Sequence, residues 1–203
     1  MTKTYAPAAY GMPVVLLNNL RSEMMSCEQM PGLSVLEHGE MVAERYFELL
    51  AYLRANEPLV NEWRLPDWIN DPIMLQQLLD DEIMRTYLTY HDCGKPRCLV
   101  IDTEGKRRFP NHAAVSENLW RELGGGEDVA KLIGLDMEIH TIKDVDIPEF
   151  AARPQAIALI LAGLSEIHAN ASLFGGIEST RFKMAYKQIN KRGKAVLDFR
   201  KKN

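Results

Sequence analysis

The amino-acid sequence predicts an all-α fold with one small β-hairpin. Apolar residues recur at helical spacing along most of the chain after residue 33. Capping residues, glycines and prolines separate these stretches into pieces of helix length. Only residues 99–102 and 107–109 form a pair of short β-prone stretches around a turn. A chain of 203 residues is also long enough to bury a sizeable core without disulfide staples.

The chain is predicted to begin with an irregular segment, residues 1–32, which prolines and glycines interrupt. A long helix is expected to follow from Ser34 to about Asn56. Ser34 is a favourable N-cap, and Glu37, three residues later, completes a capping box. Apolar side chains then recur at positions i, i+3, i+4 and i+7 as far as Leu53, which predicts one buried helix face.

A loop over residues 62–71 is expected to precede a second amphipathic helix, roughly Pro72 to Tyr90. That helix ends at His91-Asp92-Cys93-Gly94-Lys95-Pro96, in which the glycine and the proline are stop signals. The small hairpin follows, with its turn at Glu104-Gly105.

The second half of the chain is predicted to contain four helices. The first covers residues 112–123 and ends at three consecutive glycines. The second covers residues 127–140, and a turn-rich connection over residues 144–148 follows it. The third is apolar and extends over residues 154–174. The last begins at Ser179 and becomes strongly basic.

The charge balance limits the classes of partner. Twenty-four basic and 28 acidic side chains give a formal net charge of −4, which argues against an extended nucleic-acid-binding surface but permits a local phosphate pocket. Three cysteines do not make a disulfide framework, and this favours a reducing compartment. No secretory leader and no membrane-spanning apolar stretch are recognised, so we expect a cytoplasmic protein without a membrane partner.

Histidine and carboxylate side chains are the candidate chemical groups. Imidazole and carboxylate ligands suit divalent ions such as iron, manganese, zinc, nickel or cobalt. Ligands on separate helices of a bundle can converge on one interior point, although a scattered histidine is more often a structural polar residue. The five histidines are His38, His91, His112, His140 and His168.

The segment from His91 to Lys95 resembles a known signature. It follows an apolar-periodic helix and resembles the His-Asp-x-Gly-Lys word of the HD-domain metal-dependent phosphohydrolase superfamily. The order of the other segments is similar to phage-type HD domains and to those near CCA-adding enzymes. These segments are residues 35–42, 109–116, 137–140 and 164–169. The resemblance covers roughly residues 32–175. It implies an HD-domain helical bundle over residues 33–178, with the irregular segment 1–32 before it and a basic helix, residues 179–203, packed on it or extending from it.

The resemblance also implies a ligand set for one or two divalent metal ions, of which Mn, Fe, Mg, Ni, Co and Zn are all chemically suitable. Asp92 would be the carboxylate that bridges two ions. The implied ligands are His38, His91, Asp92, His112, His140 and Glu166. The last ligand of the family is usually aspartate, so Asp144 and Asp146 in the loop after His140 are rivals to Glu166.

The implied reaction is the hydrolysis of a phosphate ester of a nucleotide or of an RNA 3′ end by metal-activated water. Asp92 and Lys95 are the expected catalytic residues, since Asp92 would position the water and Lys95 would hold the substrate phosphate. Substrate binding is predicted for Lys95, Arg97 and Lys183.

Two other reactive side chains are not assigned to the site. Cys93 lies inside the signature but is predicted to be a small buried filler rather than a nucleophile. His168 lies two residues after Glu166 and is therefore expected on a different face of the same helix.

Two further functions remain open. One is a di-iron oxygenase similar to myo-inositol oxygenase, which uses the same order of ligands in an HD fold. The other is a degenerate HD domain that binds a nucleotide without catalysis, and the glutamate at position 166 supports it.

Overall fold

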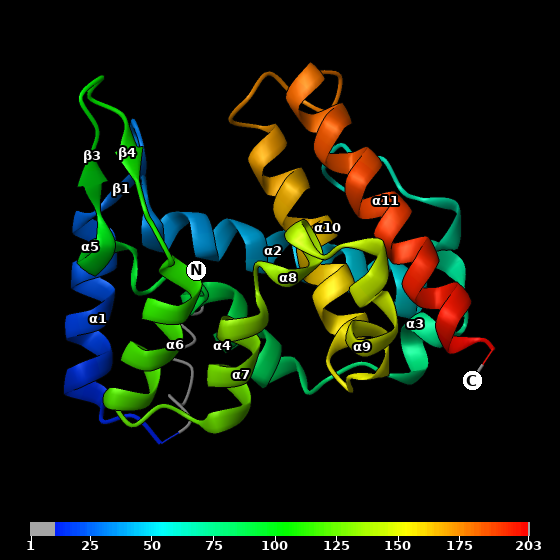
Figure 1. Ribbon diagram of the computed structural model, residues 1–203, viewed down its shortest axis with the longest axis horizontal. Coiled ribbons are helices and arrows are strands. Elements are labelled where there is room, and N and C mark those ends of the chain that lie inside the picture. Colours follow the sequence, from blue (N-terminus) through cyan, green and yellow to red (C-terminus); the bar gives the residue numbers. More distant parts are fainter. Residues whose placement is uncertain (1–10, 203) are drawn as a thin grey trace. The chain divides into compact units, whose positions relative to one another are not determined.

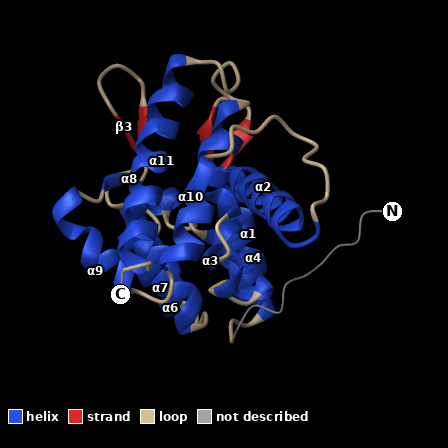
Figure 2. Cartoon of the chain, turned by 90° about the vertical axis from the view of Figure 1, so that its right-hand side faces the viewer, coloured by secondary structure: helices blue, strands red, loops and turns tan. Residues whose placement is uncertain are grey.

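Helices dominate the computed structural model, which describes residues 11–202 (Figure 2). In that range the strands form only two small antiparallel sheets of two strands each. The predicted all-α class with a small β-hairpin is therefore confirmed.

Contacts between residues group the chain into two compact units. The first unit comprises residues 1–40 and 80–135, and the second comprises residues 41–79 and 136–203. Each unit is described by itself below. The boundaries predicted from the sequence stay a prediction.

The first unit contains the beginning of the long helix α2 and both small sheets (Figure 1). Helices α6 and α7 pack against each other within it, and α4 packs on α7. Its elements are α1 (Val14–Ser26), β1 (Glu28–Met30), β2 (Leu33–Ser34), the start of α2 (Val35–Ala55), α4 (Asp81–Tyr90), α5 (Lys95–Cys98), β3 (Val100–Ile101), β4 (Arg107–Arg108), α6 (His112–Glu122) and α7 (Glu127–Leu135).

Helix α1 occupies a region that the sequence predicts to be irregular, so that prediction is wrong for residues 14–26. The helix begins directly after Pro13, whose carbonyl accepts the first helical hydrogen bonds. Leu17, Leu20 and Met24 recur at helical spacing and are buried. Pro13 precedes the helix and Pro31 follows it, so these prolines do not interrupt it. Residues 1–10 lie outside the described part of the chain.

The capping box predicted at the start of α2 is confirmed. The backbone N–H of Glu37 donates to Ser34 Oγ over 3.1 Å, and the backbone N–H of Ser34 donates to Glu37 Oε2 over 2.8 Å. These reciprocal bonds satisfy donors that a helix start leaves without partners. The first turn of α2, which carries His38, is therefore fixed by its own sequence.

The helix predicted over residues 72–90 is interrupted. Residues 73–76 form α3 (Ile73–Gln76) in the second unit, whereas α4 begins only at Asp81 in the first unit. Asp80 is the reason, because its side chain accepts hydrogen bonds from the backbone N–H groups of Glu82 and Ile83 and so caps a new helix.

The second unit is built around α10, whose side chains are almost all buried. Helix α11 lies beside α10 and also packs on α9 (Figure 1). The elements are the rest of α2, η1 (Asp67–Asn70), α3, α8 (Glu138–Thr141), η2 (Asp144–Asp146), α9 (Ile147–Ala152), α10 (Ala156–Ala171) and α11 (Thr180–Arg200). The helix predicted over residues 127–140 is thus two helices, and α9 begins inside the predicted turn.

The basic side chains of α11 have structural partners. Arg192 donates to the backbone carbonyls of His140 and Ile142, and Arg200 donates to that of Ala151. Cations that bind carbonyls at helix ends also complement the helix dipole.

Among the described helices, no single helix has the length and apolar character needed to cross a membrane. One bent pair, residues 144–152 with 156–171, meets the requirements for a membrane span in length and composition only.

Candidate metal centre

Three buried side chains of the first unit come together at the junction of α2 and α4. His38 projects from the first turn of α2, and His91 and Asp92 follow the last residue of α4. One ligand atom from each lies within 4.8 Å of the others. His91 Nε2 is 3.2 Å and His38 Nε2 is 3.9 Å from Asp92 Oδ2. The structure therefore brings together the first three ligands that the resemblance implies.

A glycine allows α2 to approach α4 this closely. Gly39 follows His38 directly, and a Cβ atom at that position would lie 2.2 Å from the backbone oxygen of Thr89. That distance is far below any van der Waals contact, so a side chain at position 39 would push the two helices apart. His38 and His91 reach the same point because residue 39 has no side chain.

The histidine rings are oriented by the backbone. His91 Nδ1 lies 2.7 Å from the carbonyl oxygen of Leu88, so this nitrogen carries the proton and donates it. The other ring nitrogen, Nε2, then lies toward Asp92 Oδ2. Metal-binding histidines usually donate their second ring nitrogen in this way, which fixes both the tautomer and the ring plane.

His112, on a different element, also has Nδ1 near a backbone carbonyl and Nε2 near Asp92. It begins α6, its Nδ1 lies 3.1 Å from the carbonyl oxygen of Phe109, and its Nε2 lies 3.6 Å from Asp92 Oδ1. Asn111 before it has a left-handed backbone and does not cap the helix with its side chain. Ser116 anchors α6 to the signature turn, because its hydroxyl accepts the N–H of Gly94.

Lys95 completes the charged cluster. Its buried ammonium donates to Asp92 Oδ2 over 2.5 Å and to Gln29 Oε1 over 2.9 Å. Its Nζ also lies 5.3 Å from the centre of the Phe109 ring, which is within cation–π range. The sequence predicts Lys95 in the site but not Gln29, which lies in β1, 66 residues earlier, and belongs to no recognisable motif.

The electrostatics of Asp92 favour a bound cation. Burial by itself raises the pKa of this carboxyl, but the neighbouring His91 and Lys95 hold the pKa well below its usual value. Asp92 therefore stays ionised. Its Oδ1 is buried and accepts no hydrogen bond from any described residue. A buried carboxylate oxygen is costly without a compensating partner, and a divalent ion is such a partner. The donor set of imidazole nitrogens and one carboxylate therefore fits a divalent metal ion.

Cys93 is buried beside the cluster and is not equipped as a nucleophile. Burial raises the pKa of its thiol to about 12, and its Sγ lies 3.6 Å from the carbonyl oxygen of Ser116. A thiol with this pKa is protonated at neutral pH, and the thiolate is the reactive form. The predicted role of a buried filler agrees with this environment.

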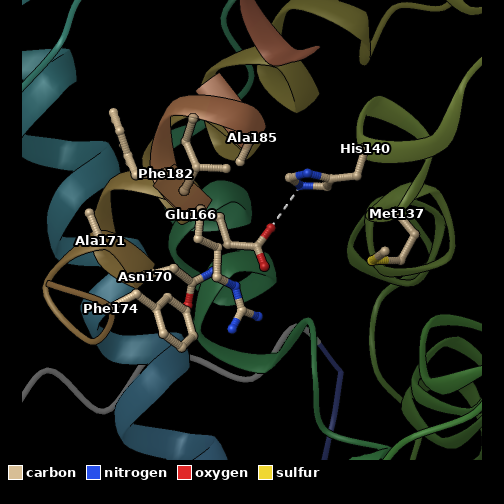
Figure 3. A pocket seen from close by; sticks show the side chains of 10 residues that line it. Met137, His140, Glu166, Asn170, Ala171, Phe174, Phe182 and Ala185 are labelled. Atoms are coloured by element: carbon tan, nitrogen blue, oxygen red, sulfur yellow. Dashed lines mark ion pairs between the residues drawn. The ribbon is translucent and has the colours of Figure 1, made fainter. Parts of the chain in front are cut away.

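In the second unit the structure brings His140 and Glu166 together. His140 Nε2 lies 2.8 Å from Glu166 Oε2 (Figure 3). Burial lowers the pKa of His140, but Glu166 outweighs it, and the pKa lies above its usual value. The rivals face elsewhere: Asp144 is exposed and pairs with Lys191, and the Asp146 side chain is exposed in η2. Of the three acidic candidates, Glu166 is therefore the one with a histidine partner.

Two predicted substrate-binding residues lie on the surface. The Arg97 guanidinium is exposed and lies 3.4 Å from a Glu23 carboxylate oxygen in the first unit. Lys183 is exposed near the start of α11, and its Nζ lies 2.7 Å from Glu178 Oε2 in the second unit. Both cations are thus engaged in surface ion pairs, which are weak and can exchange for another anion. Their binding role stays a prediction.

In comparisons with protein-family models, curated proteins and solved structures, none matches this chain. A buried carboxylate flanked by oriented imidazoles can hold a divalent cation, and an ammonium beside it can hold an anion.

Proposed function

We propose that the protein is a metal-dependent phosphohydrolase that hydrolyses a phosphate ester of a nucleotide or an RNA terminus. The observation that carries the proposal is the buried group of His38, His91 and Asp92, with the ammonium of Lys95 against the same carboxylate. Hydrolysis of a phosphate ester requires positive charge that stabilises the phosphoryl oxygens. A cation site in direct contact with a fixed ammonium provides it. The HD-type signature in the sequence supports the same reaction.

The metal would be held by His38, His91 and Asp92, with His112 beside Asp92 Oδ1. A divalent ion in such a site supplies Lewis-acid polarisation of a phosphoryl oxygen and acidifies bound water. The implied ligands His140 and Glu166 and the number of ions stay predictions from the resemblance.

The chain's own residues bind and orient the substrate. Lys95 provides a compact, partly buried positive charge that neutralises a phosphate oxygen. Gln29 Oε1 accepts a second hydrogen bond from that ammonium and helps to hold it in place. The carbonyl of Leu88 keeps the His91 ring in one orientation, so the polar groups need little reorganisation when substrate binds.

The test combines metal analysis with a panel of substrates. The purified protein is assayed for bound metal and for phosphate or nucleoside release from deoxynucleoside mono- and triphosphates, 2′,3′-cyclic nucleotides and a cyclic dinucleotide, each with added Mn²⁺. We expect turnover of at least one class. Asp92→Asn should abolish turnover and most metal binding, whereas Asp128→Asn, an exposed carboxylate of α7 in the same unit, should change neither.

The outcomes separate the alternatives. Full turnover by Asp92→Asn would refute the proposed site. Bound iron without phosphate release would favour the oxygenase. A folded protein that binds no metal and releases no phosphate would favour the non-catalytic nucleotide-binding domain.

A further inference from the structure

The second unit contains a cavity whose lining is chemically mixed. It has a volume of about 240 Å³ and lies between α8, α10 and the start of α11 (Figure 3). Its lining includes His140, Glu166, Asn170, Phe174, Arg181 and Phe182. Small-molecule sites usually measure roughly 300–1,000 Å³, so this cavity suits a single ring system.

Arg181 and Phe174 form a stacked pair at the cavity, called the platform below. The guanidinium carbon of Arg181 lies 3.8 Å from the centre of the Phe174 ring, which places the planar cation directly over the ring. Nucleobases stack both on aromatic rings and on arginine guanidinium planes. This pair therefore offers the kind of surface that a flat heteroaromatic ligand prefers. The ring of Phe182, which is buried, adds apolar surface to the lining.

Polar groups at the cavity are suited to the edge of such a ring. The Asn170 side chain contributes to the lining, and its amide offers both donors and an acceptor (Figure 3). Amide side chains make paired hydrogen bonds to adenine edges. Glu166, whose Oε2 pairs with His140, also lines the cavity. An apolar platform with donors and acceptors beside it selects a ligand that has a flat face and a polar edge.

We propose that this cavity binds a nucleobase, which stacks on the platform of Arg181 and Phe174 and forms hydrogen bonds with Asn170. The inference rests on the proposed function in one respect, because nucleotides are the substrates proposed there. Recognition of the base requires neither the metal nor the phosphate group.

The experiment measures nucleoside binding in the absence of metal. Adenosine, guanosine, cytidine and uridine are titrated into the full-length protein by calorimetry in EDTA. We expect at least one nucleoside to bind, and we expect Arg181→Ala and Asn170→Ala each to weaken it about tenfold, in line with the loss of one stacking or edge contact. Arg181→Lys keeps the charge without the plane and should weaken binding as well.

The controls distinguish this site from general binding. Lys187→Ala, at an exposed position of the same helix outside the cavity lining, should leave the affinity unchanged. Indole has a flat face without the edge groups of a base, and ribose 5-phosphate has no base, so neither should bind. Thermal unfolding of every variant confirms that it is folded.

Several results would overturn the inference. These are the absence of nucleoside binding by the folded protein, indole binding as tight as that of the best nucleoside, and full affinity in both alanine variants. Nucleoside binding without phosphate release from any substrate would support the nucleobase site and contradict the proposed phosphohydrolase activity. Phosphate release without nucleoside binding would support the phosphohydrolase activity and contradict the nucleobase site.

Discussion

The ammonium of Lys95 lies 2.5 Å from Asp92 Oδ2, three residues earlier in the same turn. The carboxylate therefore interacts at once with a fixed cation and with the imidazoles of His38 and His91. A lysine in this position stabilises the ionised form of Asp92 and is itself held ready for an anion. In the proposed site, metal binding and substrate charge would therefore be connected through one carboxylate.

Removal of the Lys95 charge should separate these two roles. Lys95→Gln keeps most of the side-chain volume and a hydrogen-bond donor, so we expect metal to be retained. The turnover number should fall about a hundredfold to a thousandfold, as it does when one electrostatic group of a preorganised site is lost. Steady-state kinetics and metal analysis of the same sample measure both effects.

The matched control is Lys106→Gln, in which an exposed lysine of the β3–β4 turn loses its pair with Glu104. Its kinetics should equal those of the parent protein. Unchanged turnover in Lys95→Gln would show that the ammonium has no part in catalysis.

Gly39→Ala tests the close contact between the helices that carry His38 and His91. The added methyl group would meet the backbone oxygen of Thr89, which is not the flexible end of a side chain. We expect the free energy of unfolding to fall by roughly 1–3 kcal/mol, the usual cost of overpacking, together with weaker metal binding. Urea denaturation measures the first effect and a metal titration the second.

The comparison for that variant is Glu44→Ala, at an exposed position of the same helix. Its unfolding free energy should change by less than about 0.5 kcal/mol. An equally small change in Gly39→Ala would show that the helices can move apart without cost, and that the glycine does not position the site.

Local sequence signals account for most of what could be predicted about the candidate site. Ser34 and Glu37 fix the start of α2 through their own hydrogen bonds, and the signature turn carries His91, Asp92 and Lys95 within five residues. Such signals act over three or four residues and can therefore be read from the chain.

The parts that could not be predicted depend on contacts between distant segments. Gln29 reaches Lys95 across 66 positions, and no pattern near Gln29 indicates this. The stacking of Arg181 on Phe174 depends on the turn between α10 and α11. Aspartate is a typical N-cap residue, so the sequence is compatible with a helix start at Asp80. The acidic residues beside it are equally typical of the exposed face of one continuous helix, and the sequence alone does not separate the two.

The role of Glu166 as the last acidic ligand can be tested against its rivals. Glu166→Gln removes the negative charge that a metal ligand needs and should lower the bound metal measured by elemental analysis. Asp146→Asn, at an exposed position of η2, should leave the metal content unchanged. The opposite pair of results would assign the ligand to the segment after His140.

His168 gives the protein a predictable dependence of stability on pH. Its Nδ1 donates to the carbonyl of Leu164 over 2.7 Å, and its Nε2 accepts the backbone N–H of Arg64 over 3.0 Å. These bonds require the neutral ring, which is also stacked on Trp63. Burial is the main cause that lowers the pKa of His168 to about 4 in the folded protein, from 6.5. Between these values the unfolded chain binds more protons than the folded one.

The stability that the neutral ring provides is therefore present above pH 6.5 and is lost as the pH falls toward 4. Each pH unit in this window costs at most about 1.4 kcal/mol. Urea unfolding at pH 7, 6 and 5 should show a steeper loss for the parent protein than for His168→Phe, which keeps an aromatic ring between Trp63 and Phe182 but cannot titrate. The difference between the two curves isolates His168 from the other histidines. Parallel curves would mean that protonation of His168, which removes the acceptor for the backbone N–H of Arg64, costs the folded protein no measurable stability.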